Sequence, residues 1–408
     1  MDGLDADIGC NVDIDTQEVL LVASQHNIRR LRELIRENDK LENPVNARDP
    51  ETGFTPLHAA IAACEPESPD TDQNGANSPH STQDNDLIEK GIETVKFLLH
   101  EGAIWNDLDA KNETPGCLAR RLKLNDIYEL MVDAGVRAEL LLARLEGYEP
   151  LQDDDDDDDD ETQENPDTAG DHGVEHTQSQ TEDQEQPDVV NHRYLISGLS
   201  FEGTRLLDSD RNGVMMAWES EIMEKSATAL LPKPGLRVLN IGHGMGIVDG
   251  FFRDLKPASH HIIEAHPAVV AEMKSKGWHE KPGVTIHEGK WQDILPKLID
   301  EGEIFDAIYY DTFAESYSDF RLFLSEYVIG LLDADGKWGF FNGMGADRQI
   351  SYDVYQKVVE IDLLEAGFDV DWQEISVPSL DNDKEWEGVR RKYWVIDSYR
   401  LPVCRYLE

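Results

Sequence analysis

A glycine-spaced turn between an apolar strand and a helix constrains the fold of this chain more than any other sequence feature. The apolar run at residues 237–241 leads into Gly242, Gly244 and Gly246, and a helical pattern follows from Ile247. Glycine lets the backbone turn sharply and lets a ligand approach where a Cβ atom would otherwise stand. The pattern is typical of open α/β sheets that bind nucleotide-like ligands at the end of the first strand.

Further apolar runs alternate with helical patterns after the turn, which predicts a parallel α/β sheet. We expect strands at residues 260–264, 284–288, 307–310 and 338–341, then a helix through 363–367 and two last strands at 369–377 and 393–400. Ligands lie at the carboxyl ends of strands in such sheets, so the residues that follow the strands should point into one crevice. These residues are Glu264, Trp291, Asp311 and Asn342.

The glycine spacing and an acidic residue narrow the choice of ligand. Glu264 ends the strand after the turn, where a carboxylate can grip the ribose hydroxyls of either NAD or S-adenosylmethionine. Ile247 stands where the dinucleotide fingerprint has its last glycine, and a methyl donor has no pyrophosphate to cradle. These features favour S-adenosylmethionine and a class I Rossmann-like methyltransferase domain, whose sheet usually ends in a hairpin. An NAD-dependent oxidoreductase is the alternative.

Two carboxylates are predicted to face this cofactor. We expect a helix over about 214–230, in which Met215, Glu219 and Met223 are spaced four residues apart and share one face. Because a buried unpaired carboxylate is costly, Glu219 should have a cationic partner in this apolar stripe. Asp311, at the end of the strand at 307–310, supplies the second carboxylate. An ordinary internal salt bridge of Glu219 is the alternative interpretation.

Two carboxylates beside a methyl donor suit the methylation of a guanidinium group. That group is planar and cationic, and its delocalised nitrogen lone pairs are poor nucleophiles. A bidentate carboxylate clamp can orient it and hold one nitrogen in line with the methyl group, and one carboxylate can accept the proton. The sequence therefore predicts that Glu219 and Asp311 are the catalytic residues of a guanidino methyltransferase.

Residues 16–147 read as an all-α module of ankyrin-repeat type. Residues 55–60 (Thr-Pro-Leu-His-Ala-Ala) match the opening of an ankyrin repeat, and a degenerate copy begins at Thr114-Pro115. Their separation exceeds the repeat period of about 33 residues, and we assign the excess to an acidic insertion at 65–86. Residues 94–103 resemble the second repeat helix, with Gly102 as its C-cap. Such stacks bind partners, so substrate docking and a stabilising cap on the catalytic domain both remain open.

Composition predicts the boundaries of the linker and the second domain, and it indicates which class of molecule the protein binds. Residues 151–190 contain an aspartate run at 153–160 and no Lys or Arg, which predicts a disordered acidic linker before a methyltransferase domain at 191–408. The net charge of -47 argues against nucleic acid, whose phosphates need Lys and Arg, and favours a basic protein partner. The 4 cysteines are scattered, and we find no secretory signal or membrane span. We expect a monomer in the cytoplasm and nucleus.

These motifs resemble a known family. Met215, Trp218-Glu219 and Met223 are similar to the helix before the cofactor loop of guanidinoacetate methyltransferase. The similarity continues through residues 242–246 (Gly-His-Gly-Met-Gly), 264–266 (Glu-Ala-His), 289–291 (Gly-Lys-Trp), 310–312 (Tyr-Asp-Thr) and 364–368 (Leu-Glu-Ala-Gly-Phe). With the ankyrin-like module in front, the whole chain resembles the fungal type IV protein arginine methyltransferases, which methylate the internal δ-nitrogen (N5) of arginine in proteins.

The resemblance implies roles for individual residues. Cofactor contacts are implied at Tyr194, Met223, Gly242, His243, Gly244, Met245, Gly246, Ile247, Glu264, Ala265, His266, Trp291, Gln292 and Asp311. Substrate contacts are implied at Met215, Glu219 and Asn342, with Glu219 and Asp311 holding the guanidinium. His261, Glu264 and His266 look like a metal cluster, but His261 and Glu264 point to opposite faces of a strand. We therefore predict no metal.

One departure from the small-molecule enzyme concerns the substrate. That enzyme grips its substrate carboxylate with the backbone of a Thr-Ser pair, and Met344-Gly345 stand at the corresponding place here. This favours a protein substrate, and the resemblance suggests a ribosomal component. A free guanidino compound remains an alternative substrate. A non-catalytic interaction protein built on the ankyrin module is a further alternative, against which the intact Glu219 and Asp311 argue.

Overall fold

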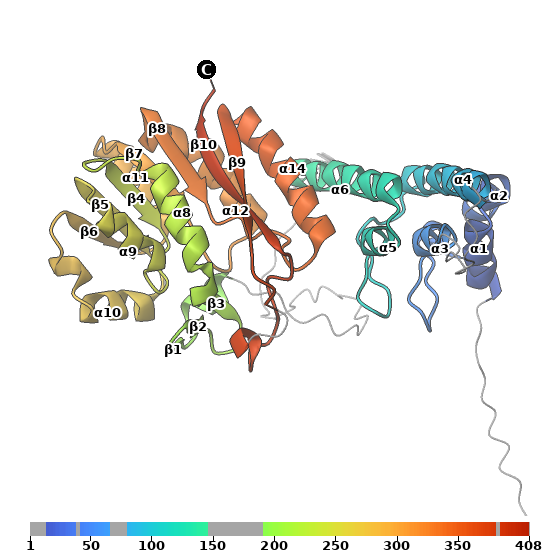
Figure 1. Cartoon of the computed structure of the whole chain (residues 1–408), viewed down its shortest axis with the longest axis horizontal. Helices are drawn as coiled ribbons and strands as arrows, with labels where there is room; N and C mark the ends of the chain where they lie inside the picture. Colours follow the sequence, from blue (N-terminus) through green and yellow to red (C-terminus); the bar gives the residue numbers. More distant parts are fainter. Residues whose placement is uncertain (1–13, 38–40, 66–79, 146–190, 381–383, 408) are drawn as a thin grey trace, which may run out of the picture.

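The computed structural model describes residues 14–37, 41–65, 80–145, 191–380 and 384–407. A helical module forms one end of the molecule and an α/β domain the other (Figure 1). The predicted linker at 151–190 and most of the predicted insertion lie outside the described residues. Within them, no helix is both long enough and apolar enough to cross a bilayer.

The helical module contains α-helices joined by tight turns, as its sequence predicts. Thr55 and Thr114 cap α3 and α5, since their side chains accept hydrogen bonds from the backbone of His58 and Cys117. The loops before these helices are joined by a bond from Ala110 N to Thr52 O at 2.9 Å. The elements are α1 Ile14–Ser24, α2 Ile28–Glu37, η1 Pro44–Asn46, α3 Pro56–Ala62, α4 His80–His100, α5 Pro115–Arg121 and α6 Asn125–Leu145.

Helix α4 differs from its sequence prediction at one end. The predicted helix covers residues 94–100, whereas α4 begins at His80, inside the stretch assigned to an insertion. The buried side chains of Val95 and Leu98 place one face of α4 in the module core. The last residues of the predicted insertion, from His80 on, are therefore helix rather than loop. They continue without a break into the part of α4 that packs in the module core. Its end at His100, followed by Gly102 at φ +95°, is as predicted.

The α/β domain contains a seven-stranded sheet in the order β6-β5-β4-β7-β8-β10-β9. Neighbours from β6 through β8 are parallel, and β10 runs antiparallel to both β8 and β9. The predicted α/β sheet with a terminal hairpin is therefore confirmed. The strands are β4 Arg237–Ile241, β5 Ser259–Glu264, β6 Val284–Glu288, β7 Phe305–Tyr310, β8 Leu332–Phe340, β9 Phe368–Ser376 and β10 Ser398–Tyr406.

Helices cover both faces of this sheet because successive strand residues point to opposite sides. Val238 joins an apolar cluster with α8, α9 and α10, whereas Leu239 and Ile241 join one with α11, α12 and α14. The order reverses at β4 and β7, which is where ligands bind in such sheets. The helices are α7 Asn191–Leu195, α8 Ser220–Leu230, α9 Ile247–Asp254, α10 Pro267–Ser275, η3 Trp278–Glu280, α11 Trp291–Asp300, α12 Tyr317–Leu322, the π-helix η4 Phe323–Tyr327, α13 Val328–Leu331, α14 Gln349–Glu365 and η5 Lys384–Trp386.

The predicted helix over 214–230 is wrong in its first third. Residues Gly213–Met216 form strand β3, which pairs with β2 Arg205–Leu207 beside β1 Ser200–Glu202, and a 3-10 turn at Ala217–Glu219 leads into α8. Met215 therefore lies on a strand, although Met215 and Met223 still share one apolar cluster. The pairing with β2 is a non-local interaction that helical spacing cannot reveal, and it overrides the local pattern.

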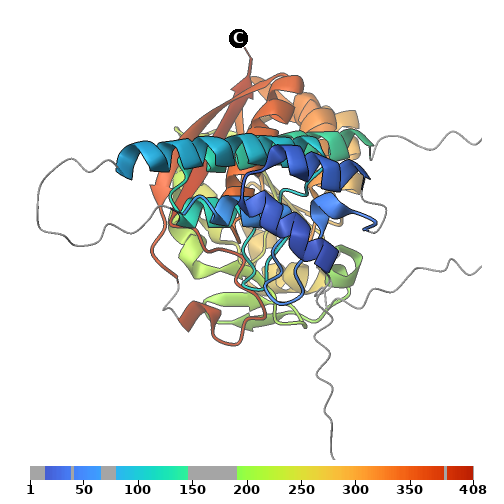
Figure 2. The same ribbon diagram turned by 90° about the vertical axis from the view of Figure 1, so that its right-hand side faces the viewer.

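The helical module shares its apolar core with the α/β domain. Ile350, Val354 and Val358 of α14 are buried in the same cluster as residues of α5 and α6. Seen from the module end, the helices of the module (blue to teal) lie in front of the α/β domain (Figure 2). Gly116 and Gly135 allow this approach, because a Cβ atom at either position would lie 1.8 Å from Ile350 Cδ1 or 2.6 Å from Val354 Cγ2. The module is therefore packed against α14 rather than merely tethered to it.

The shared core predicts that one substitution on α14 destabilises the whole chain. Ile350→Ala should lower the free energy of unfolding by about 2–5 kcal/mol, because Ile350 is 1% exposed and its removal leaves a cavity. Leu364→Ala on the same helix should change it by less than about 0.5 kcal/mol, because Leu364 is 59% exposed. Urea unfolding of both variants checks this, and equal effects would contradict a shared core.

Candidate active site

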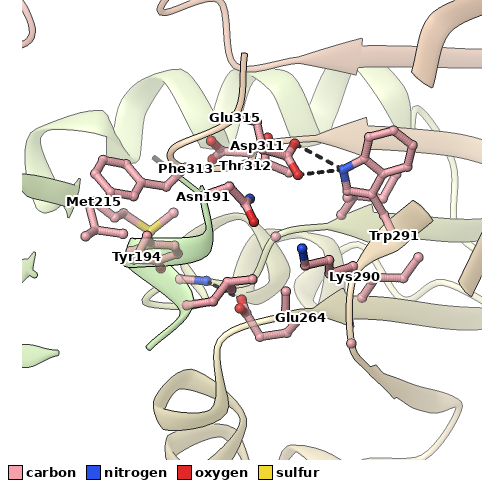
Figure 3. Close-up of a pocket in the computed structure, with 18 residues that line it drawn as sticks. Asn191, Tyr194, Met215, Glu264, Lys290, Trp291, Asp311, Thr312, Phe313 and Glu315 are labelled. Carbon is pink, nitrogen blue, oxygen red and sulfur yellow. Dashed lines mark hydrogen bonds between the residues drawn. The ribbon is translucent and has the colours of Figure 1, made fainter. Parts of the chain in front are cut away.

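A pocket opens at the carboxyl ends of β4, β5 and β7, where the sequence predicts a ligand crevice (Figure 3). Eight of the predicted site residues line it: Tyr194, Met215, Gly242, Gly244, Glu264, Ala265, Trp291 and Asp311. They come from α7, β3, the glycine turn, the end of β5, the start of α11 and the end of β7. The fold thus brings together residues that lie more than a hundred positions apart in the sequence.

The glycine turn has a left-handed backbone, and neighbouring protein atoms leave no space for side chains. Gly242, Gly244 and Gly246 have φ values of +92°, +54° and +76°. A Cβ atom on Gly242 would lie 1.8 Å from the backbone oxygen of Asp311, and one on Gly244 would lie 2.7 Å from Met215 Cε. Glycine at these two positions therefore lets the turn pack directly against the two elements that carry the predicted substrate residues.

Glu264 fixes the other side of this turn. Its Oε2 accepts hydrogen bonds from the backbone N–H groups of His243 at 2.9 Å and Gly244 at 3.3 Å, and its Oε1 accepts one from His266 at 2.7 Å. Bonds to a carboxylate are stronger than bonds between neutral groups. Since each carboxylate oxygen has two lone pairs, Oε1 of Glu264 can still accept one hydrogen bond from a ligand hydroxyl while the carboxylate holds the turn.

His243 and His266 face away from the pocket. His243 Nδ1 lies 2.6 Å from Asp249 Oδ2, and His260 Nε2 lies 2.7 Å from Asp249 Oδ1, in a fully buried cluster under the turn. Burial would raise the pKa of Asp249, but the two histidines lower it to about 2. His266 caps α10 and its Nε2 lies 3.1 Å from Tyr194 O, so it holds α7 beside the pocket.

The other predicted residues lie around the pocket rather than on its wall. Met223 is fully buried in the apolar cluster under β4, and Met245, Gly246 and Ile247 lead into α9. Gln292 points toward Glu315, with Nε2 at 3.5 Å from Oε1.

Asn342 is held inside the sheet. Its amide nitrogen donates to Tyr352 OH at 3.1 Å and to Arg400 O at 3.0 Å, and its backbone N–H donates to Tyr399 OH at 3.0 Å. The side chain is 2% exposed, so the structure places its amide among residues of α14 and β10 rather than in the pocket.

Glu219 is buried and is not among the residues that line the pocket, and it lacks the cationic partner that the sequence led us to expect. The residue is 4% exposed, and within the described part of the chain no Lys, Arg or His forms an ion pair with it. Its Oε1 accepts a short hydrogen bond from Tyr393 OH, and its Oε2 accepts one from Met216 N at 3.4 Å. Burial and the nearby Asp311 raise the pKa of Glu219 to about 8. The alternative interpretation of Glu219, an ordinary internal salt bridge, is therefore wrong for the described residues.

Asp311 lines the pocket as the second carboxylate. Its backbone N–H donates to Ile241 O at 2.9 Å, which continues the β4–β7 pairing past the strand end. Its Oδ2 is buried and has no hydrogen-bond partner among the described residues. Burial, and to a smaller extent Asp249, raises the pKa of Asp311 to about 7. The two carboxylates interact electrostatically, and neither forms an ion pair with a Lys, Arg or His of the described residues, although Lys290 lines the same pocket as Asp311.

Known proteins resemble this chain closely. The family described as guanidinoacetate N-methyltransferase matches residues 204–392. A relative from Aspergillus fumigatus, "Protein arginine N-methyltransferase 2", is 63% identical over 99% of this chain and 99% of its own length. Relatives of the same name from Aspergillus oryzae and Neurospora crassa are 64% and 45% identical, covering 98% and 96% of this chain and of their own lengths.

The chain belongs to the protein arginine N-methyltransferase 2 family. The family that the sequence motifs resemble is thereby confirmed. The match to the guanidinoacetate family covers the α/β domain only, whereas the arginine N-methyltransferase 2 relatives extend over the helical module as well.

The sequence did not reveal two side chains at this site, Glu315 and Tyr393. Glu315 accepts from Trp291 Nε1 at 2.8 Å and also from Tyr310 OH, so it fixes the indole that lines the pocket. Tyr393 binds Glu219 from a segment far along the chain. Neither residue stands in a motif; the only signal for Glu315 is its place in the loop after a predicted strand. No group of His, Cys, Asp or Glu side chains in the described ranges is arranged to hold a metal.

The raised pKa values predict that the carboxylates cost stability at alkaline pH. The ordinary pKa of Glu219 is 4.5, so between pH 4.5 and about 8 the folded protein holds a proton that the unfolded chain has lost. Stability contributed by this group therefore falls as pH rises through that window, and Asp311 acts likewise up to about 7. Glu219→Gln should raise the melting temperature at pH 9 but not at pH 4.5, by about 2–4 °C for each kcal/mol of relief.

A matched control distinguishes the effect of removing a buried carboxylate from the effect of removing any negative charge. Glu221 lies on the same helix, with its side chain 61% exposed and paired with Lys225 at 2.7 Å. Glu221→Gln should show no gain that depends on pH. Melting curves from pH 4.5 to 9 check both variants, and a gain of the same size for each would count against a buried, ionisable Glu219.

Proposed function

We propose that this protein transfers a methyl group from S-adenosylmethionine to the guanidinium of arginine residues in other proteins. The observation that carries the proposal is the pair of carboxylates, the buried Glu219 and the pocket-lining Asp311 with its buried Oδ2, neither of which forms an ion pair with a Lys, Arg or His of the described residues. Such a pair is costly unless a positively charged group binds there. A guanidinium supplies that charge together with donors arranged to fit carboxylate oxygens.

The pocket fits the proposed cofactor. Glu264 stands where it can accept from ribose hydroxyls, and Tyr194 and Trp291 supply aromatic surface on the pocket wall. The buried Oδ2 of Asp311 lacks a partner, which is the kind of polar atom that a bound ligand completes. When bound, S-adenosylmethionine supplies an electrophilic methyl group on a sulfonium.

The carboxylates prepare the guanidinium nitrogen for attack. Glu219 and Asp311 can each accept N–H bonds from the planar group, which fixes its orientation. This lowers the activation barrier, because the entropy cost of orienting the group is met on binding. Binding of the cation lowers the pKa of both carboxyl groups, because an opposite charge favours their ionised form. Asp311, whose Oδ2 is free, can then accept the proton that leaves the nitrogen as it is methylated.

We also propose the δ-nitrogen as the site of methylation, which makes the enzyme type IV. The support is the match of the catalytic domain to the guanidinoacetate family, to which the sequence motifs are also similar. In guanidinoacetate and in a δ-methylated arginine alike, the nitrogen that is modified already carries the alkyl chain. The same match favours a free guanidino compound as the second candidate substrate.

The helical module supports a protein substrate. We propose that it is a degenerate pair of ankyrin-type repeats, from the Thr-capped helices α3 and α5 and the paired loops before them. The net charge of -47 favours basic substrate proteins, of which a ribosomal component is one. A monomeric state, the lack of direct nucleic-acid binding and a cytoplasmic and nuclear location stay predictions.

Methyl transfer from labelled S-adenosylmethionine to separate pools of basic proteins and of small guanidino compounds tests the proposal. Label in the protein pool, released by acid hydrolysis as δ-N-methylarginine, is the expected result. Label in ω-methylarginine would overturn the type IV assignment alone. Label only in the small-molecule pool would favour the second candidate, and no label in either pool would overturn the methyltransferase proposal.

Loss of either carboxylate should remove turnover but not the cofactor. Glu219→Gln and Asp311→Asn should each lower kcat/KM by about 10²–10⁴, because each removes an acceptor for the cation or the proton. Binding of S-adenosylmethionine, followed by calorimetry, should persist in Glu219→Gln. Glu221→Gln is the control and should keep full activity. Activity within about twofold of the wild type in Glu219→Gln would show that the clamp is placed wrongly.

A further inference from the structure

The hydroxyl of Tyr393 is the strongest contact of the Glu219 carboxylate. It donates to Oε1 over a sequence separation of 174 residues, whereas the other hydrogen bond that the described residues make to this carboxylate, from Met216 N, is long at 3.4 Å. Tyr393 belongs to the segment between β9 and β10, and it is the first residue after the range 204–392 that the guanidinoacetate family matches. A segment near the end of the chain therefore completes the surroundings of a predicted catalytic residue.

Packing holds this tyrosine in one orientation. Its ring meets the ring of Trp386 edge-on, at 5.0 Å between centroids, and lies 6.0 Å from that of Trp218. A Cβ atom on Gly213 would lie 2.8 Å from Tyr393 Cε1, so the strand β3 backbone presses against the ring. The next residue, Trp394, is 1% exposed and donates from Nε1 to Ile396 O at 2.7 Å. The phenol is thus fixed on both sides.

We propose that Tyr393 is a positioning residue, which orients the Glu219 carboxylate for the guanidinium and holds it ready as an acceptor. This rests on the function proposed above. A neutral donor suits the task because it fixes one carboxylate oxygen without supplying a positive charge. A Lys or Arg in its place would form an internal ion pair and occupy the charge that the substrate must meet.

The groups around this contact are themselves acidic or neutral. Asp311, at the end of β7, interacts electrostatically with Glu219, and so do the phenols of Tyr309 on β7 and Tyr399 on β10 with both carboxylates. Each of these phenols has its pKa raised well above 10 by burial, so they stay neutral over the working range of pH. The bond from Tyr393 lowers the pKa of Glu219, against the larger opposing effect of burial.

Removal of the phenol hydroxyl should therefore shift a pH profile. In Tyr393→Phe, the acidic limb of kcat/KM should move to higher pH by about one to two units, because a hydrogen bond to a charged group is lost. At pH 7 the variant should be correspondingly slower. Tyr406→Phe is the matched control, since Tyr406 also lies in the terminal hairpin and its OH donates to Ile329 O of α13 and Leu332 O of β8, away from Glu219. A uniform loss of rate with an unmoved limb would overturn the proposal.

A second measurement does not depend on methyl transfer. The fall in melting temperature caused by Tyr393→Phe should be larger at pH 9, where Glu219 is ionised, than at pH 6. In a Glu219→Gln background, the fall should be the same at both pH values. A fall that is independent of pH in both backgrounds would overturn the proposal even in an active enzyme. A wild type without methyl transfer would overturn the proposed function, while this comparison would still decide the role of Tyr393.

Discussion

The rest of this structure depends on two carboxylates, the buried Glu219 and the pocket-lining Asp311, which have no ion-pair partner among the described residues. Burial raises the pKa of Glu219 to about 8 and of Asp311 to about 7, so the folded protein holds them at a cost. The same cost makes the site selective, because a planar cation with several N–H donors relieves it and a neutral ligand does not. Binding strength and loss of stability have one origin here, which is a common feature of active sites.

The scaffold that tolerates this pair is extensive. Apolar clusters on both faces of the seven-stranded sheet bury β7, the strand that ends just before Asp311. Gly242, which has no side chain, packs directly against the Asp311 backbone. The helical module adds a third cluster, which reaches onto α14. The terminal hairpin then brings Tyr393 onto Glu219. Parts of the chain that are distant in sequence therefore all help to hold Glu219 and Asp311 in place.

The sequence anticipated much of the sheet and part of the site. The strands at β4, β5 and β6 were predictable because each apolar run is short and is bounded by turn residues, and Asp311 followed from its place at a strand end. Met215 was placed on a helix because its spacing is helical, although pairing with β2 makes it a strand residue. Asn342 and His266 follow strands as expected, yet neither lines the pocket, because each is bound by other parts of the fold.

By itself, the sequence determined the alternation of strands and helices, the glycine turn and the presence of carboxylates at strand ends. These features depend on local periodicity and on the backbone freedom of glycine, both of which can be read from residues that are consecutive in the chain. Only the tertiary structure decided that Glu219 has a tyrosine and not a cation as its partner, that Glu315 fixes Trp291, and that the helical module shares its core with α14. Those contacts join residues far apart in the chain, and burial, which shifts their pKa values, exists only once the chain has folded.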